Sequence, residues 1–134
     1  MAETIELELA TPERRMVSEQ VTDLRVPGLD GYLGILPGHA PLLSLLGCGA
    51  LSYAAGGARR YLAVQGGQLE VLPGQVRVLA DAAERAEDID LAKARAELER
   101  AQKELRNSFT GETSSAALNA VALAQARIAA AEGK

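Results

Sequence analysis

Polar and apolar side chains alternate in short segments along the first two thirds of the chain. The alternation covers residues 5–9, 22–26, 62–64, 69–71 and 76–78. Because successive side chains of a β-strand point to opposite faces, a period of two indicates strands with one buried face. Pro-Gly and Gly-Gly pairs interrupt these segments at short intervals, as at Pro27-Gly28 and Gly66-Gly67. Short strands separated by frequent turns predict an all-β sandwich or barrel.

Two of these turns carry a more specific signal. Leu72-Pro73-Gly74-Gln75 suits a type II turn, which favours proline at its second position and glycine at its third. Ala55-Gly56-Gly57-Ala58 suits a two-residue hairpin, because glycine adopts the positive φ angles that such a turn requires.

After residue 87 the apolar residues recur every three or four positions, which is typical of helices. Asp88 and Asp90 can cap the first helix and complement its dipole. A break at residues 107–111 separates it from a second helix, predicted to begin near Thr113 or Ser114. The short break favours an antiparallel helical hairpin. The two apolar stripes comprise Leu91, Ala94, Leu98, Ala101 and Leu105, and then Ala117, Val121, Ala124, Ile128 and Ala131.

Composition divides the chain at the same place. Residues 1–86 hold all 5 prolines and 11 of the 13 glycines, whereas residues 87–134 hold no proline and 13 alanines. The sequence therefore predicts an α+β protein in two parts: a β-sandwich domain over residues 1–86 and a helical hairpin over residues 87–134. Alanine methyl groups bury little area, and helices of this length are marginal alone. We therefore expect the hairpin to dock weakly and to be able to open.

The charge and the rarer residues exclude several classes of protein. A net charge of -4 argues against a basic surface that binds nucleic acid. One cysteine, Cys48, excludes an internal disulfide, and one histidine, His39, excludes a zinc site built on paired histidines. No nucleophile and base can be paired, so we expect no catalytic residues, no metal and no enzyme activity. The sequence also shows no secretory signal and no segment long enough to span a bilayer.

The order of motifs carries a family resemblance. Val26-Pro27-Gly28-Leu29-Asp30-Gly31-Tyr32-Leu33-Gly34-Ile35-Leu36-Pro37-Gly38-His39-Ala40-Pro41-Leu42-Leu43 is followed by Gly67-Gln68-Leu69-Glu70-Val71, by Val76-Arg77-Val78-Leu79-Ala80-Asp81-Ala82-Ala83 and by Asp88-Ile89-Asp90. This series closely resembles the epsilon subunit of bacterial and organellar F-type ATP synthases over nearly the whole chain. The resemblance implies about ten strands in two five-stranded sheets, followed by the hairpin.

The resemblance also implies a function. The chain would be a non-catalytic rotor subunit of the central stalk that couples ion flow through the c-ring to ATP synthesis. Its partners would be the gamma subunit and the c-ring, with the alpha and beta subunits met by an extended hairpin that inhibits ATP hydrolysis. Its place would be peripheral, at the cytoplasmic face of a bacterial inner membrane or the equivalent side of a thylakoid membrane.

Two segments match the family's contact with the c-ring and the gamma subunit. Many relatives carry a glutamate at the position of Tyr32, and a tyrosine would offer apolar area and one hydroxyl instead. The second segment can equally be read as a rigid turn in which His39 orders a loop. The interface residues implied are Asp30, Gly31, Tyr32, Leu33, Pro37, Gly38, His39, Ala40 and Pro41.

A candidate ATP site is implied on the folded hairpin, because some members carry an I/L-D-x-x-R-A motif there. Lys93 stands where that motif has arginine, and a lysine does not replace the planar fork of arginine. Arg127 is the only charged residue between Ser114 and Ala131, which also predicts modest or steric inhibition. The alternative is a helix cap and a solvated helix face. The residues concerned are Ile89, Asp90, Lys93, Ala94, Arg100 and Arg127.

A different class of function remains open from the residues alone. A small ligand-binding β-sandwich module could oligomerise through its helices. Such modules usually bind through exposed aromatic residues, and this chain has only three tyrosines and one phenylalanine.

Overall fold

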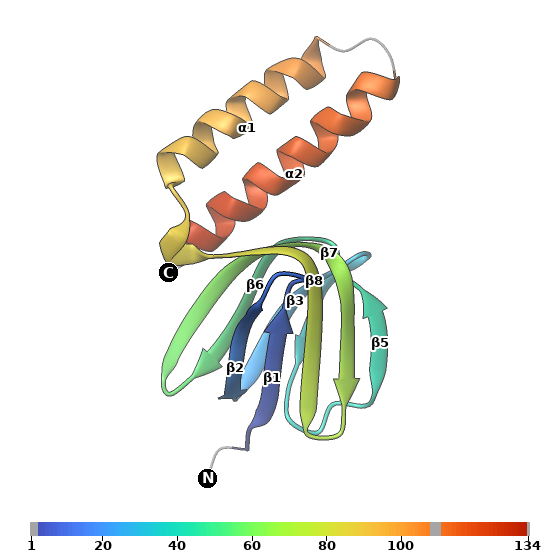
Figure 1. The fold of residues 1–134 in the computed structure, drawn as a ribbon, viewed down its shortest axis with the longest axis vertical. Coiled ribbons are helices and arrows are strands. Elements are labelled where there is room, and N and C mark those ends of the chain that lie inside the picture. The colour runs from blue at the N-terminus through green and yellow to red at the C-terminus, as the bar shows by residue number, and fades with distance from the viewer. Residues whose placement is uncertain (1–2, 108–110, 134) are drawn as a thin grey trace.

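The chain forms a β-sandwich followed by two antiparallel helices (Figure 1). A computed structural model describes residues 3–107 and 111–133. The strands are β1 (Ile5–Ala10), β2 (Arg15–Val21), β3 (Asp23–Gly28), β4 (Gly31–Ile35), β5 (Leu42–Leu45), β6 (Cys48–Ala55), β7 (Ala58–Leu72) and β8 (Gln75–Arg85). A 3-10 turn η1 (Ala86–Asp88) leads to α1 (Leu91–Arg106) and α2 (Gly111–Gly133). The predicted fold class is therefore confirmed.

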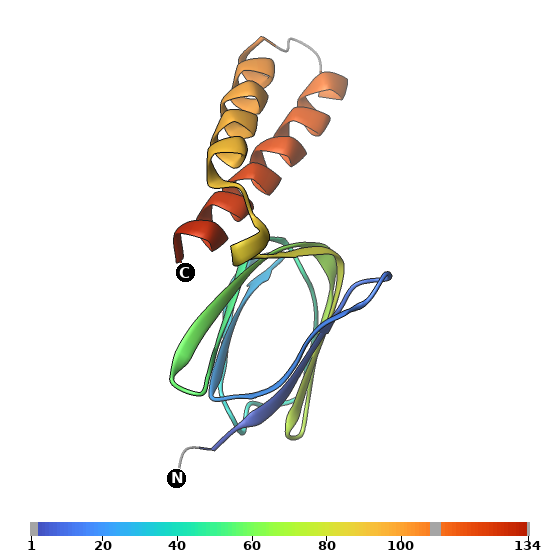
Figure 2. The same ribbon diagram turned by 60° about the vertical axis from the view of Figure 1, so that its left-hand side comes forward.

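The strand count differs from the expected ten, because the two longest strands serve both layers of the sandwich. The second half of β7 pairs with β5, and the first half of β8 pairs with β1, which completes layer A in the order β2-β1-β8-β7-β5. The other halves form layer B in the order β8-β7-β6-β3-β4. The hydrogen-bonded sheet is thus continuous and contains eight strands, although each layer has five positions. Figure 2 shows β7 and β8 curving between the layers.

The bend occurs at Gly66-Gly67, where a local turn signal was visible in the sequence. Both residues have positive φ angles, 64° and 113°. A Cβ atom on Gly67 would overlap the carbonyl oxygen of Leu79 on the neighbouring strand. Only glycine fits this close approach, so the sheet can fold over itself here without ending either strand.

Both specifically predicted turns are confirmed. Ala55 pairs with Ala58 across a turn in which Gly56 and Gly57 have φ angles of 58° and 81°. Leu72 pairs with Gln75, and Gly74 between them has a φ angle of 73°, as a type II turn requires.

Aliphatic residues from both layers fill the space between them. The buried cluster contains one aromatic residue, Tyr53, in keeping with the composition. Burial raises the pKa of its phenol, and the nearby carboxylate of Glu19 adds to the effect. The largest fully buried side chains are Leu7, Leu9, Leu24, Ile35, Leu51, Leu62 and Leu69, with valines 21, 26, 64, 76 and 78.

The helices follow the predicted pattern with one correction. The side chain of Asp90 accepts the backbone N–H of Lys93 at 3.1 Å, which confirms the predicted cap of α1. The second helix begins at Gly111 rather than near Thr113 or Ser114. The apolar stripe of this helix starts only at Ala117, so the spacing of apolar residues could not locate the first turns of the helix. Within the described ranges, neither helix combines the length and the apolar character that crossing a membrane requires.

Candidate functional site

The hairpin rests on the outer face of layer B through a small cluster that we call the dock. α2 packs against β6 and β7, while the other side of α2 packs against α1. Four of the six buried residues in the dock are helix alanines, so the contact is close but its area is small. The dock consists of Ala63, Ile89, Ala94, Ala126, Ala130 and Ala131, with Cys48, Ala50, Tyr61, Leu91 and Ile128 packed partly buried around them.

Cys48 contributes to this surface as a packed side chain. It lies half-buried at the start of β6, and burial raises the pKa of its thiol above the ordinary value. A raised pKa leaves less of the nucleophilic thiolate at neutral pH, which suits a packed side chain rather than a reactive thiol.

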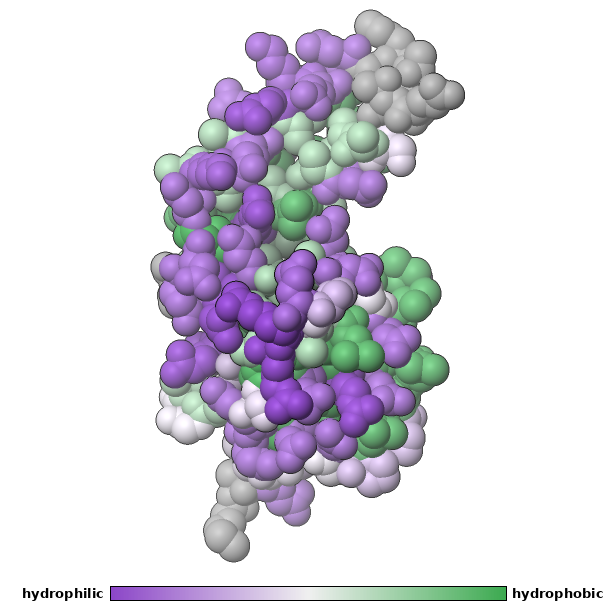
Figure 3. All heavy atoms as spheres, in the orientation of Figure 1, coloured by the Kyte–Doolittle hydropathy of each residue, from purple (hydrophilic) through white to green (hydrophobic). Residues whose placement is uncertain are grey.

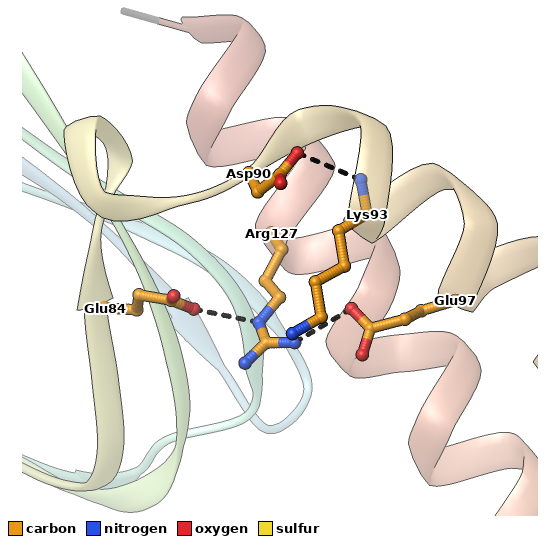
Figure 4. A network of polar contacts seen from close by, with 5 residues as sticks. All are labelled: Glu84, Asp90, Lys93, Glu97 and Arg127. Carbon is orange, nitrogen blue, oxygen red and sulfur yellow. Dashed lines mark hydrogen bonds and ion pairs between the residues drawn. The ribbon is translucent and has the colours of Figure 1, made fainter.

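One arginine joins the three elements that meet beside the dock. The Nε–H of Arg127 on α2 donates to Oε1 of Glu84 on β8 at 2.8 Å, and its Nη1 donates to Oε1 of Glu97 on α1 at 3.1 Å. Figure 4 shows the guanidinium lying between the two carboxylates. The three side chains are roughly one third exposed, so solvent screens each pair to about 1 kcal/mol or less. We call Glu84, Glu97 and Arg127 the ion cluster.

A second ion pair connects the helices alone. Arg95 on α1 donates to Glu132 on α2 at 2.8 Å, and both side chains are more than half exposed. This pair does not involve the sandwich, so it stabilises the hairpin without fixing the hairpin to layer B.

The predicted ATP residues fall into two groups. Ile89 and Ala94 are buried in the dock, and the carboxylate of Asp90 caps α1. Arg100 and Arg127 line one hollow of ≈ 240 Å³ between the helices, together with Glu97 and Glu104. The structure therefore brings two predicted cations together but places acidic residues beside them.

The two predicted interface segments lie at opposite ends of β4. Residues 30–33 span the turn between β3 and β4 and the start of β4, whereas residues 37–41 follow its last residue, Ile35. The five residues of β4 separate these ends by about 13 Å. The second segment lies beside the turn at Pro73 and Gly74, at the end of the sandwich away from the helices (Figure 1).

The loop of residues 37–41 is a tight turn with a hollow beside it. The N–H of His39 donates to the carbonyl oxygen of Leu36 at 3.0 Å, and Gly38 has a φ angle of 87°. The imidazole Nδ1 lies 2.7 Å from the carbonyl oxygen of Ala40, to which its N–H donates. His39 thus orders the loop while remaining exposed. Residues 38–41 and 71–74 help to line the adjacent hollow of ≈ 350 Å³.

Tyr32 makes a contact that the sequence did not indicate. Its side chain is 56% exposed, yet its hydroxyl accepts the backbone N–H of Ala50 at 3.0 Å. The ladder between β3 and β6 ends at Arg25 and Ser52, so the hydroxyl takes over a hydrogen bond that β3 no longer provides. Ala50 borders the dock, which connects the predicted interface edge to the surface under the hairpin.

A row of exposed leucines was also missed. Leu43 and Leu45 on β5 and Leu79 on β8 are 69%, 59% and 41% exposed on the outer face of layer A. We call these three residues the leucine face. Figure 3 shows apolar residues gathered over this side of the sandwich. The available signal was the run Leu42-Leu43-Ser44-Leu45-Leu46, in which both faces of a strand carry leucine.

Charged residues border the leucine face. Arg77 on β8 lies 4.0 Å from Glu8 on β1 and 3.7 Å from Glu70 on β7, measured between charged atoms. An apolar surface with a charged border has the composition of a protein-binding site.

Comparisons with known proteins agree with this geometry. The family model of the ATP synthase delta/epsilon chain beta-sandwich domain matches residues 4–86. The ATP synthase epsilon chain of Solibacter usitatus (strain Ellin6076) is 57% identical over 134 residues, which is 100% of both chains. That of Koribacter versatilis (strain Ellin345) is 47% identical over 108 residues, covering 81% of this chain and 76% of the relative.

The fold comparison points the same way. A chain in the cryo-EM structure of the Euglena gracilis mitochondrial ATP synthase, OSCP/F1/c-ring, matches with a TM-score of 0.82 at 24% identity. The match covers 91% of this chain and 78% of that chain. Because identity is this low, the match shows a shared fold, and the full-length match to the curated relatives carries the assignment. The chain belongs to the ATP synthase epsilon-chain family.

Proposed function

We propose that the chain is a non-catalytic rotor subunit in the central stalk of an F-type ATP synthase. It couples ion flow through the c-ring to ATP synthesis and is held at the cytoplasmic face of the membrane through its complex. Support comes from the epsilon-chain relatives, one of which matches over the full length. The similar Euglena chain belongs to an assembly whose description includes F1 and the c-ring.

The observation that carries the proposal is the difference between the two outer faces of the sandwich. Layer A presents the leucine face, whereas on layer B the strands β6 and β7 hold the C-terminal part of α2 through alanines (Figure 2). A rotor subunit needs one firm contact with the stalk and one element that can be released. We assign the leucine face to the gamma subunit, because exposed leucines next to charged residues suit a permanent protein contact.

The two loop segments provide contacts of a different kind. Because residues 30–33 and residues 37–41 lie at opposite ends of β4, they form two separate contact points toward the c-ring and the gamma subunit. The turn of residues 36–39 is closed by the hydrogen bond from His39 to Leu36, and we expect such a closed turn to transmit torque with little internal movement.

The hairpin is proposed to regulate ATP hydrolysis. α2 carries leucine, valine and alanine around most of its surface, and Leu118 is 54% exposed in the compact form. An extended α2 would therefore bury more apolar surface among the alpha and beta subunits than it does here. With Arg127 as its one cation between residues 114 and 131, it would block by its bulk rather than by charge.

The direct test is ATP hydrolysis by the cognate complex lacking this subunit. The complex is titrated with the full chain and with residues 1–86, which contain the whole core of the sandwich. We expect both to bind and only the full chain to lower the rate. Equal rates with both would remove the inhibitory role, and failure of both to bind would remove the assignment to the stalk.

A further inference from the structure

The ATP site implied on the hairpin can be tested against the geometry of Arg127. Two of the three guanidinium nitrogens donate to carboxylates, Nε to Glu84 and Nη1 to Glu97. These charge-assisted hydrogen bonds are the kind that an arginine would make to a phosphate. The arginine on which phosphate binding by α2 would depend is therefore already bound within the chain.

The charge around Arg127 also disfavours an anion. Figure 4 shows the side chain of Lys93 extending from the first turn of α1 toward the ion cluster. The ion cluster itself has one positive and two negative groups, and counting Lys93 with it brings the sum only to zero. With no net positive charge, the cluster lacks the attraction that draws a triphosphate out of water.

The remaining residues of the implied site are engaged elsewhere. Ile89 and Ala94 are buried in the dock, and the carboxylate of Asp90 accepts a backbone N–H of α1. Arg100 is exposed, but the hollow that it lines also contains Glu97 and Glu104. In this compact form the residues present do not fit a nucleotide phosphate.

We infer that Glu84 and Glu97 take the place of a ligand phosphate on Arg127, so that the compact hairpin is held by an internal ion cluster. Opening of the hairpin then responds to ionic strength and not to nucleotide concentration. This inference rests on the proposed regulatory role of the hairpin and deepens it.

The weakness of the dock makes the ion cluster important. Alanine methyls stabilise the contact between α2 and β7 only slightly, so the ion pairs contribute a substantial share of the docking free energy. Glu84 is also the member that ties the helices to the sandwich, because it lies on β8 while Glu97 and Arg127 lie on the helices.

Amide hydrogen exchange of α2 in the purified full chain, measured by mass spectrometry, tests the inference. Exchange is followed while NaCl rises from about 0.1 M to about 1 M, which shortens the Debye length from roughly 10 Å to 3 Å. The same measurement is made with millimolar ATP and with inorganic tripolyphosphate. The variants are Arg127→Gln and the double variant Glu84→Gln, Glu97→Gln, each of which removes charge but keeps a polar side chain.

Arg95→Gln provides the matched control. It breaks an ion pair between the same two helices that does not reach the sandwich. We expect salt to accelerate exchange of α2 by about three- to tenfold in the wild type, and each cluster variant to show that acceleration already at low salt. Arg95→Gln should stay close to the wild type.

The measurements with ATP and with tripolyphosphate distinguish an internal ion cluster from a ligand-binding site. ATP and tripolyphosphate should leave the wild type unchanged, whereas tripolyphosphate should slow exchange in the double variant, where Arg127 is free. Slower exchange of the wild type with ATP would overturn the inference, and so would a lack of response to salt and to Arg127→Gln. A double variant that ignores tripolyphosphate would show that Arg127 offers no anion site, which also contradicts the inference. Because no partner subunit is present, none of these outcomes depends on the hydrolysis assay that tests the proposed function.

Discussion

The sandwich and the hairpin are held by contacts of very different strength. Leucine, isoleucine and valine from both layers fill the core of the sandwich, whereas alanines dominate the dock. A buried leucine stabilises by about 2 kcal/mol or more, while an alanine methyl stabilises by less than about 1 kcal/mol. The contact that holds the hairpin is therefore the weaker of the two. The proposed role as a rotor subunit with a movable regulatory arm requires this difference.

The ion pairs of the two regions also have different roles. In the sandwich the described ion pairs join strands of one layer, and the core between the layers is apolar. The hairpin, by contrast, is fixed by a small dock together with the ion cluster of Arg127. Single substitutions in the two regions should therefore differ in how much they lower the free energy of unfolding. They should also differ in which part of the chain they unfold.

The largest effect is expected in the core of the sandwich. Leu69→Ala removes a fully buried side chain from the middle of layer A and leaves a cavity. We expect the free energy of unfolding to fall by about 3 kcal/mol, measured by urea denaturation. Leu43→Ala is the matched control, because Leu43 lies on the adjacent strand with its side chain in solvent. A cost for Leu43→Ala equal to that of Leu69→Ala would place the leucine face in the core and contradict its assignment as a contact surface.

A substitution at the bend between the layers should lower the free energy of unfolding by nearly as much. Gly67→Ala places a Cβ atom against the carbonyl oxygen of Leu79 at a φ angle of 113°. We expect a loss of about 2–3 kcal/mol from backbone strain, read from the same denaturation curve. At Gly34 a Cβ atom would meet nothing within 4 Å, so Gly34→Ala should be close to neutral. Equal behaviour of the two variants would mean that the bend relaxes and that glycine is not required there.

Local sequence signals predicted β1, β3, β7, β8, the two specific turns and the cap of α1, because each of these depends on neighbours within a few residues. No local alternation indicated β2, β4, β5 or β6. Asp90 reaches an N–H three residues away, and Ala55 pairs with Ala58. The count of about ten strands came from the family resemblance, and the structure has eight because β7 and β8 each serve both layers. Gly66-Gly67 has the local signature of a turn, and only the long-range pairing of β7 with β8 shows that both strands continue through it.

The ion cluster and the leucine face were not predicted, because both depend on residues that are far apart in the sequence. Arg127 stood out in the sequence as a lone cation, but its partners Glu84 and Glu97 are 43 and 30 residues away. The leucine run of residues 42–46 could not tell a buried face from an exposed one, because both faces of β5 carry leucine. Burial of one face and exposure of the other follow from the pairing of β5 with β7.

A smaller effect is expected in the dock. Ala130→Gly removes a fully buried methyl group from α2, and Ala129→Gly removes an exposed one from the same helical turn. Both lose about 1 kcal/mol of helix propensity, so their difference isolates the contact with the sandwich at about 0.8 kcal/mol. Hydrogen exchange of α2 measures that difference, and the denaturation midpoint of the sandwich should not change. A lowered midpoint for Ala130→Gly would mean that hairpin and sandwich unfold together. This result would contradict the claim that the two regions differ in how firmly they are held.

The smallest total loss is expected at the link between the predicted interface edge and the dock, at about 1 kcal/mol, whereas Ala130→Gly loses about 1.8 kcal/mol in helix propensity and contact together. Tyr32→Phe keeps the ring but removes the hydroxyl that accepts the N–H of Ala50. The N–H then loses its partner, at a cost of about 1 kcal/mol. We expect exchange of the Ala50 amide to rise about fivefold by NMR, because 1.4 kcal/mol corresponds to a factor of ten.

Tyr61→Phe is the matched control for this link. Within the residues that the structure describes, the hydroxyl of Tyr61 makes no hydrogen bond, although its ring packs against the dock. If Tyr32→Phe also accelerates exchange in α2 and Tyr61→Phe does not, the hydrogen bond of Tyr32 supports the surface on which the hairpin lies. A partner bound at Tyr32 would then change the stability of the dock through Ala50 on β6. The sandwich and the hairpin would be coupled through this residue. Unchanged exchange of Ala50 in Tyr32→Phe would remove this link and leave Tyr32 as a surface contact alone.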